Sequence, residues 1–404
     1  MSQRPAEAIN SARIPRGVWV LGFVSMLMDI SSELIHSLLP VFMVSVLGAN
    51  ALMVGLVDGV AEATALIVKV FSGALSDYLG RHKGLAVFGY GLGALSKPLF
   101  ALATRVEAVF AARFLDRIGK GMRGAPRDAL VAELTPKSIR GAAYGLRQSL
   151  DTVGAFVGPV LAMALMLAWS GNFRKIFWFA TIPGVLSVAL LVIGIHEPES
   201  VTTGQARTPI DRRALKQLDP AYWRLVVMGA IFTLARFSEA FLILRARQKG
   251  LPDALAPAVF VLMNATYALT AYPAGILADR ISRRSLLAGG LVVLIASDLA
   301  LALAPGMAVV AIGIVLWGLH MGLTQGLFAA MVADAAPVQL RGTAFGFFNL
   351  ASGIAILMSS ALAGLLWDKV GPSSTFYAGA GFATIALALL IGPMTVETHR
   401  PTPC

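Results

Sequence analysis

Cysteine and charged side chains are both scarce in this chain of 404 residues. Its one cysteine is Cys404, the last residue, so an intramolecular disulfide, a cysteine-based metal site and thiol catalysis are excluded. Only 14% of the residues are charged, against about 25% in an average soluble protein. A chain with so few charges could not cover a water-exposed surface, which excludes a water-soluble enzyme. Disorder is excluded as well, because it requires low hydrophobicity and 57% of these residues are hydrophobic.

The apolar residues occur in long blocks. Each block holds about 20–28 residues, enough to cross a hydrocarbon core of ~30 Å as a helix. The pattern predicts an all-α polytopic membrane protein with twelve transmembrane helices, which we place at 17–46, 50–76, 84–104, 106–132, 139–168, 173–195, 221–246, 254–278, 285–304, 306–334, 341–367 and 373–395.

A polar stretch from about Glu197 to Asp219 divides these spans into six and six. The predicted organisation is therefore a cytoplasmic N-terminal tail, a first six-helix bundle, a cytoplasmic central loop, a second six-helix bundle and a cytoplasmic C-terminal tail. The corresponding boundaries are 1–16, 17–195, 196–220, 221–395 and 396–404.

The distribution of basic residues predicts the orientation. The net charge is +11, yet the cations lie mostly in short loops and form no basic patch with interleaved aromatics, so we expect no nucleic-acid partner. With the N-terminus inside, the inside segments hold roughly 16 Lys and Arg and the outside segments roughly 6, as the positive-inside rule requires. We therefore expect a multi-pass protein of the cell (inner) membrane with both termini cytoplasmic.

Two sequence signatures repeat at an offset of about 201–202 residues, half the chain. The segment GALSD at 73–77 recurs as GILAD at 275–279, and both copies are followed by basic residues. The segment RGAAYG at 140–145 recurs as RGTAFG at 341–346. Agreement of two separate signatures at one offset indicates two homologous halves of parallel topology, an arrangement whose substrate site typically lies at the midplane between the halves.

The segment 73–83 (GALSDYLGRHK) resembles the loop signature between spans 2 and 3 of the major facilitator superfamily, although Tyr78 stands where that family often has arginine. The resemblance extends over the whole chain and identifies it as an efflux-type bacterial member. It implies the fold of that superfamily, two pseudo-symmetric six-helix bundles. Arg113, in the context RFLxxxG, resembles the family's span-4 arginine. Gly154, Gly158 and Pro159 resemble the core of its antiporter motif, without the usual trailing glycine pair.

The resemblance also implies a role for the loop signatures and the basic residues beside them. They would form a conformational latch at the cytoplasmic ends of the two halves, through ion pairs and helix N-termini, which favour nearby carboxylates. Direct contact with substrate is the alternative. The residues concerned are Gly73, Asp77, Gly80, Arg81, Lys83, Arg140, Gly275, Asp279, Arg283 and Arg341.

Ionisable groups within the spans are concentrated in the first half. Each costs at least ~2.5–3.5 kcal/mol inside hydrocarbon, so such groups normally face a cavity or a partner. In spans 1 and 2 their spacings of three and four place them on one helical face. The candidates for substrate binding or proton coupling are Asp29, Glu33, His36, Asp58, Glu62, Arg113, Arg117, Arg147, Asp151, Arg236 and Glu239.

Asp29, Glu33 and Glu62 are the foremost candidates for proton carriers. A carboxyl group taken out of water is easier to protonate, whereas a nearby arginine favours its ionised form. Such a pair could take up a proton facing one side and release it facing the other. The alternative is a static ion pair that joins spans, for example Glu62 with Arg147 or Asp151 with Arg117.

The same span-1 residues suggest a second alternative. Asp29, Glu33 and His36 are ligand types that suit a divalent ion, but three ligands on one helix do not converge easily, and the chain has only five histidines. We therefore predict no bound metal, and keep a divalent metal exporter as an alternative function.

These observations lead to one functional prediction, a secondary active transporter that works by alternating access, with proton-coupled export (antiport) of a small solute. Proton-coupled or facilitated uptake of a small organic solute is a further alternative. No Walker-type nucleotide-binding segment is present, and neither a channel filter nor a nucleophile–base set stands out. We expect no enzymatic activity, no cofactor, a monomer in the lipid bilayer, and a small molecule or ion and protons as the partners.

Overall fold

The computed structural model describes residues 14–79, 81–196, 217–324, 326–337 and 340–391, apart from the side chains of residues 77, 137 and 279. The described residues form helices and no strand. The first half contains α1 (Arg16–His36), α2 (Leu39–Ser45), α3 (Ala51–Leu79), α4 (His82–Leu102), α5 (Val106–Glu133), η1 (Lys137–Ile139), α6 (Arg140–Ala168) and α7 (Phe173–Gly194). The second half contains α9 (Pro220–Ala235), α10 (Ala240–Gln248), η2 (Asp253–Leu255), α11 (Ala258–Arg280), α12 (Arg283–Leu303), α13 (Met307–Thr324), α14 (Leu327–Ala335), α15 (Arg341–Lys369) and α16 (Pro372–Ile391).

Eleven helical segments of the described residues are long and apolar enough to cross a membrane. The helix outside that set is α5, which has the length but carries several charges, among them the buried Arg113, Asp116 and Arg117. These side chains are directed into the protein, so their charge does not prevent α5 from lying among the other spans. With α5 counted, the segments agree with the twelve predicted from the sequence. Most of the predicted N-terminal tail and central loop, and the whole of the predicted C-terminal tail, lie outside the described residues.

Three predicted spans are interrupted instead of continuous. The first breaks between α1 and α2, just before Pro40 at the start of α2. The seventh breaks at residues 236–239, between α9 and α10. The tenth breaks before α14, where Gly326 has a φ of +78°, a left-handed conformation that glycine adopts readily. Periodicity did not predict these interruptions because apolar residues continue on both sides of each one.

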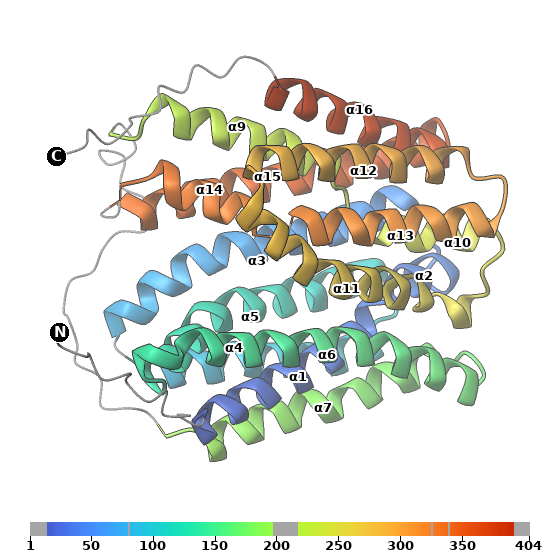
Figure 1. Cartoon of the computed structure of the whole chain (residues 1–404). Coiled ribbons are helices and arrows are strands. Elements are labelled where there is room, and N and C mark those ends of the chain that lie inside the picture. Colours follow the sequence, from blue (N-terminus) through green and yellow to red (C-terminus); the bar gives the residue numbers. More distant parts are fainter. Residues whose placement is uncertain (1–13, 80, 197–216, 325, 338–339, 392–404) are drawn as a thin grey trace, which may run out of the picture.

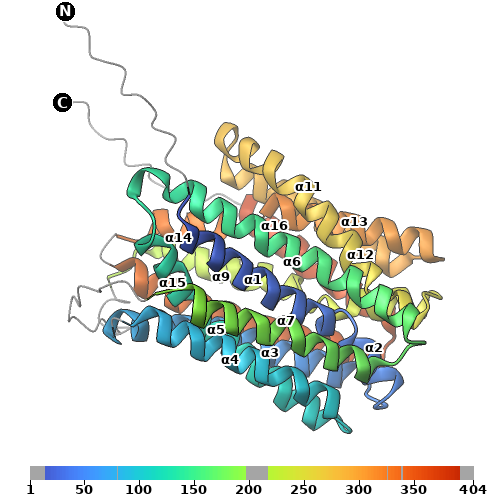
Figure 2. The ribbon, with the colours of Figure 1, turned by 90° about the horizontal axis from the view of Figure 1, so that it is seen from below.

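The two halves pack in the same way internally. In the first half α1 packs on α6 and α7, and α4 packs on α5 and α7; in the second half α12 packs on α13 and α16, and α9 packs on α15 and α16. The most extensive contacts between the halves are α3 with α15 and α6 with α11, and smaller ones join α2 and α3 with α10 and α6 with η2. The 201-residue offset relates α3 to α11 and α6 to α15, so each of the two extensive contacts is the counterpart of the other. Figures 1 and 2 show the halves as two groups of roughly parallel helices.

We call the end of the bundle that holds Arg16 and Ile391 the terminal face, and the other end the opposite face (Figure 1). On the opposite-face side, α3 and α15 approach closely enough for backbone to touch backbone. A Cβ on Gly364 would lie 2.6 Å from the carbonyl oxygen of Ala51, and one on Gly55 would collide with the carbonyl oxygen of Ser360. We call this contact, between residues 51–63 of α3 and 353–368 of α15, the glycine seam.

Polar contacts between the halves are distributed unevenly along the bundle. Ser45 donates a hydrogen bond of 2.8 Å to Asp253, and the backbone N–H groups of Ala51 and Leu52 donate to Asp368. Among the described residues, the hydrogen bonds between the halves all lie between the opposite face and the middle of the bundle. Within this described part of the chain, no hydrogen bond or ion pair joins the halves in the part of the bundle nearer the terminal face. The halves are therefore closed against each other at the opposite face and separate toward the terminal face.

Candidate functional site

A cavity lies between the halves and consists of two adjoining lobes. The central lobe has a volume of about 540 Å³, and Glu33, Asp58, Arg236 and Glu239 are among its lining residues. The entry lobe has a volume of about 530 Å³ and extends toward the terminal face along α1, α3, α5 and α6. Six residues line both lobes, so they are continuous: Glu33, Glu62, Leu66, Lys120, Ala155 and Asn264. Both volumes fall in the range of small-molecule sites, roughly 300–1,000 Å³.

Asp58 of α3 is the most connected carboxylate of the central lobe. Arg113 donates two hydrogen bonds to its Oδ1, of 2.8 and 3.2 Å, and Nε2 of His36 lies 3.6 Å from its Oδ2. Ser238, from the second half, donates a hydrogen bond of 2.6 Å to the same Oδ2. Asp58 therefore links three elements of the first half to the interrupted span of the second. Because its side chain is buried, these hydrogen bonds satisfy a carboxylate that has little access to water.

Glu62, one turn further along α3, faces the cavity more openly. Its carboxylate lies 3.2 Å from Nη1 of Arg117 and 3.7 Å from Nη2 of Arg113. The side chain retains 37% of its exposure, whereas that of Arg117 retains 2%. The sequence-based alternative paired Glu62 with Arg147 and Asp151 with Arg117; both pairings are wrong, because α5 lies beside α3 and α6 lies beside α1.

A buried ion pair supports Arg117 from behind. Lys97 of α4 donates to Asp116 at 2.6 Å and to the hydroxyl of Ser32 at 2.9 Å. Lys97 and Asp116 are only 1% and 2% exposed. The other oxygen of Asp116 lies 3.7 Å from Nε of Arg117. Asp116 thus holds the arginine that meets Glu62, and Lys97 neutralises Asp116.

Further ion pairs line the entry lobe. Asp151 lies 2.9 Å from Nη1 of Arg147 and 3.6 Å from Nη1 of Arg127. Asp29 lies 4.0 Å from Arg123, at the limit of an ion pair. Arg147 and Asp151 are one turn apart on α6, as their sequence spacing predicts. Asp29, Glu33 and His36 share one face of α1, as predicted. Glu33 and His36 face each other, whereas Asp29 faces Arg123.

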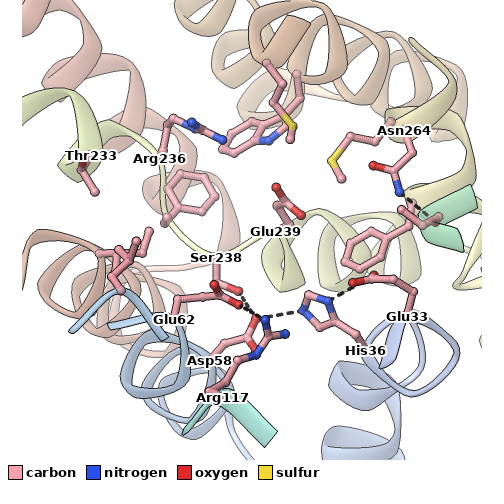
Figure 3. A pocket seen from close by; sticks show the side chains of 18 of the residues that line it. Glu33, His36, Asp58, Glu62, Arg117, Thr233, Arg236, Ser238, Glu239 and Asn264 are labelled. Atoms are coloured by element: carbon pink, nitrogen blue, oxygen red, sulfur yellow. Dashed lines mark hydrogen bonds and ion pairs between the residues drawn. The ribbon is translucent and has the colours of Figure 1, made fainter. Parts of the chain in front are cut away.

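The second half contributes the interrupted span. Arg236, Phe237, Ser238 and Glu239 lie between α9 and α10, and all four line the central lobe. The side chains of Arg236 and Glu239 form no ion pair or hydrogen bond with any described residue; Nε of Arg236 is buried without a partner, and its guanidinium lies 5.9 Å from the ring centroid of Phe232. Figure 3 shows Arg236 and Glu239 on the other side of the cavity from Glu33, His36, Glu62 and Arg117.

The antiporter-like residues of α6 hold that helix against α1 at the carboxylates. A Cβ on Gly154 would lie 2.7 Å from the carbonyl oxygen of Met26 and 3.0 Å from the Cβ of Asp29. A Cβ on Gly158 would lie 2.8 Å from the Cβ of Glu33. Pro159 follows within the same helix and is buried. These small residues permit the close packing that positions Asp29 and Glu33, and the antiport role itself stays a prediction.

The predicted latch residues lie at the terminal face, and those that are described contact their own half. Lys83 donates to the carbonyl of Val192, Arg140 to that of Thr135 and Arg341 to that of Ala333. Arg283 pairs with Asp334, also within one half. The side chains of Asp77 and Asp279, and the whole of Gly80, lie outside the described residues. Gly73, Arg81 and Gly275 are at the same face, and the latch role stays a prediction.

No group of three His, Cys, Asp or Glu side chains in the described part of the chain could hold a metal ion. Nδ1 of His36 lies 3.4 Å from Glu33, and Nε2 faces Asp58. The guanidinium of Arg113, bonded to the same Asp58, places a fixed positive charge where a cation would bind.

Lys97, Lys120, Ser238 and Asn264 are not on the list of site candidates given by the sequence. Lys97 had a detectable signal, since a lone lysine inside an apolar span needs a buried partner. Lys120 lines both lobes. Ser238 and Asn264 had no signal, because serine and asparagine are unremarkable in a span until the facing helix is known. The amide of Asn264 donates to the carbonyl of Ala155 across the two halves.

The cavity between two pseudo-symmetric bundles defines a membrane transporter fold, and comparison with known proteins gives the family. The model of the Major Facilitator Superfamily matches residues 21–265 and 225–403. An uncharacterized MFS-type transporter of Methanocaldococcus jannaschii is 33% identical over 388 residues, which cover 95% of this chain and 96% of that protein. The chain belongs to the major facilitator superfamily.

More distant relatives agree with that assignment. Quinolone resistance protein NorA of Staphylococcus aureus is 24% identical over 217 residues, 54% of each chain. A crystal structure of a POT family transporter with a thioalcohol-conjugated peptide matches with a TM-score of 0.78 at 14% identity, covering 93% of this chain and 95% of that one. The nucleoside transporter NupG matches with a TM-score of 0.77 at 13% identity, covering 93% and 98%. These structures establish likeness of fold.

Proposed function

We propose that this protein is a secondary active transporter that exports a small solute in exchange for protons by alternating access. One observation carries the proposal. The charged cavity between the halves extends toward the terminal face, while the glycine seam and its flanking hydrogen bonds close the opposite face. A site that meets only one side at a time is the basic requirement of alternating access.

The terminal face is the cytoplasmic one in this proposal. Basic residues gather there, among them Arg81, Arg140, Arg280, Arg284 and Arg341, and cytoplasmic loops carry the excess of Lys and Arg. The conformation described is then open to the cytoplasm. Export is favoured by the packing of the antiporter-like glycines against Asp29 and Glu33, and by the similarity to a resistance protein, since extrusion of a toxic solute confers resistance.

Proton coupling is assigned to Glu62, with Glu33 and Asp29 as the neighbouring carboxylates. Glu62 is the part-exposed member of its ion pair with Arg117, so a proton can reach it from the entry lobe. Protonation would remove the negative charge that balances Arg117, and the positive charge left in the cavity would weaken the binding of a basic group of the solute. Antiport requires this competition, in which the proton and the solute are not bound together.

Two other functions remain as alternatives. Uptake on the same scaffold would use the same groups with the gradients reversed. Divalent metal export is supported less, because of the fixed cation of Arg113 beside Asp58 and the absence of a three-ligand group among described residues.

The test uses purified protein in proteoliposomes that contain a pH-sensitive dye. Substrate counterflow is screened with organic anions, zwitterions, cationic drugs, sugars and divalent metals, with and without a pH gradient. A transporter of the proposed type shows saturable counterflow for one class and moves protons when that class is added. Saturable flux that is unaffected by collapse of the gradient would leave a facilitator, and flux of metals alone would establish the metal alternative.

Glu62→Gln then tests the coupling residue, because glutamine mimics a permanently protonated acid of similar size. We expect substrate-for-substrate exchange to persist and gradient-driven accumulation to be lost. Glu107→Gln is the matched control, since Glu107 is exposed at the opposite-face end of α5. Full gradient-driven accumulation by Glu62→Gln would place the coupling site elsewhere, with Glu33 and Asp29 as the next candidates.

A further inference from the structure

The two walls of the central lobe differ in chemical character. The first half contributes charged side chains, including Glu33, Glu62 and Arg117. The second half contributes large apolar side chains, which are Phe237, Phe260, Met263, Trp317, Met321 and Ile356. At the repeat offset, Trp317 and Met321 stand where the first half has Asp116 and Lys120. A solute in this lobe meets ions on one side and aromatic rings and thioethers on the other.

Most ionic groups of the central lobe already have partners. Asp58 is held by Arg113, Glu62 by Arg117, and Glu33 by His36. These pairs satisfy one another and leave little charge for a solute.

Three charged side chains of the lobe have no such partner. Lys120 comes from the first half, and Arg236 and Glu239 come from the second. None of them forms a hydrogen bond or ion pair with another described residue, and Nε of Arg236 is buried and unsatisfied. The charges that face Lys120 are Arg117, Glu62, Glu33 and Asp29, and the first two are paired with each other. Lys120 is exposed in the cavity and Arg236 and Glu239 are part-buried, so a ligand can reach all three; the buried Nε of Arg236 has no partner, which is costly unless a ligand satisfies it.

We propose that the solute is an amphipathic zwitterion, with an acidic group, a basic group and an aromatic or similarly large apolar body. The acidic group is held by Lys120 and Arg236, which bring one cation from each half. The basic group is held by Glu239, and the apolar body packs against the second-half wall around Phe237 and Phe260. This assignment rests on the proposed function and names the substrate class of the same cavity.

The assignment also explains why the solute would be occluded. Lys120 and Arg236 lie in different halves, so an acidic group that binds both joins the halves across the cavity, in addition to the hydrogen bond from Asn264 to the carbonyl of Ala155. A cation that lacks the acidic group binds Glu239 alone, within one half. Closure is therefore favoured by the zwitterion and not by its fragments.

The test measures equilibrium binding to purified full-length protein in detergent, by calorimetry, with two matched series of probes. Phenylalanine and tryptophan are each compared with their N-acetyl forms, which are anions, their methyl esters, which are cations, and their doubly blocked neutral forms. Loss of one charge-assisted contact costs about ten-fold in affinity or more. We expect the zwitterion of at least one series to bind at least ten-fold more tightly than its three blocked forms.

Variants assign the contacts. Glu239→Gln should abolish the preference for the zwitterion over the N-acetyl form. The same variant should keep the preference for the zwitterion over the methyl ester. Lys120→Gln and Arg236→Gln should abolish the preference over the methyl ester. Lys175→Gln, exposed near the opposite face, is the control and should change neither preference.

The outcomes separate this assignment from the proposed function. Zwitterion binding with no flux in proteoliposomes would support the assignment and overturn transport. Two binding results would overturn the assignment: equal affinity for the blocked forms and the zwitterion, or no binding of any of the eight compounds. If counterflow of another solute class is observed at the same time, transport itself stands.

Discussion

Replacing Ser238 with alanine removes a hydrogen bond that spans the two halves. Its hydroxyl donates to Asp58 at 2.6 Å, and this contact exists only while the halves are closed on the opposite-face side. Asp58 keeps Arg113 and His36 as partners within its own half, so the variant weakens the closed arrangement without leaving an unpaired carboxylate. We expect the population to shift toward the state that opens at the opposite face.

The expected size of the shift follows from the type of bond. Hydrogen bonds to charged groups contribute about 1.5–3 kcal/mol, which corresponds to a change of about 10- to 150-fold in the ratio of the two states. A state populated at about 1% would then rise to between about 10% and 60%. A change of that size is measurable as a second population of distances.

The assay is double electron–electron resonance with spin labels on engineered cysteines, after Cys404→Ser removes the native thiol. One pair, Arg105→Cys with Gln248→Cys, reports on the opposite face, and a second, Ser138→Cys with Arg280→Cys, reports on the terminal face. Ser238→Ala should add a longer distance to the first pair and a shorter one to the second.

Ser297→Ala is the matched control. Its hydroxyl is buried and donates to the carbonyl of Gly313 within the second half, so its loss should cost stability without redistributing the two states. If Ser238→Ala and Ser297→Ala both leave the distances unchanged, the hydrogen bond does not hold the halves together and the reasoning is wrong.

Three further predictions concern stability, and melting temperature checks each of them. Lys97→Ala should lower the stability of folding by about 3–5 kcal/mol by leaving Asp116 buried and unpaired, and Lys97→Met combined with Asp116→Leu should recover most of it; failure to recover would mean that the pair has a role beyond neutralisation. Gly158→Val should destabilise strongly, because its side chain would meet the Cβ of Glu33, so a wild-type melting temperature would contradict the close packing. Asp298→Asn should leave the melting temperature unchanged or raise it, since both carboxyl oxygens are buried with no partner in the described structure; a clear decrease would indicate a partner that is missing from this account.

The sequence predicted the number of spans, the two-fold repeat and the family, because each depends on residue type and spacing alone. A span needs about 20 apolar residues, and a repeat needs only agreement at one offset. The candidate list also included Glu33, His36, Asp58 and Glu62, which line the central lobe; a charged residue in a span seldom faces lipid.

Partners across helices could not be predicted in the same way. Which cation meets Glu62 depends on α5 lying beside α3, and a rotation of either helix by one residue would change the answer. The same limit explains why Ser238 was missed, because its importance comes only from Asp58 on the facing half. The break at residues 236–239 was missed because an apolar run resumes directly after it, at residues 240–244 at the start of α10.

The glycine seam gives the bundle a mechanical property. Backbone rests on backbone from residue 51 to residue 63 of α3, and the remaining part of that helix to Leu79 continues for about 24 Å, at 1.5 Å per residue, packed on α5 of its own half. The seam acts as a fulcrum and the rest of α3 as a lever arm. Each degree of rotation at the seam displaces the far tip by about 0.4 Å, so a modest tilt opens a passage several ångströms wide. A methyl group added at Gly55 or Gly364 would force the backbones of α3 and α15 apart and would therefore displace the fulcrum itself.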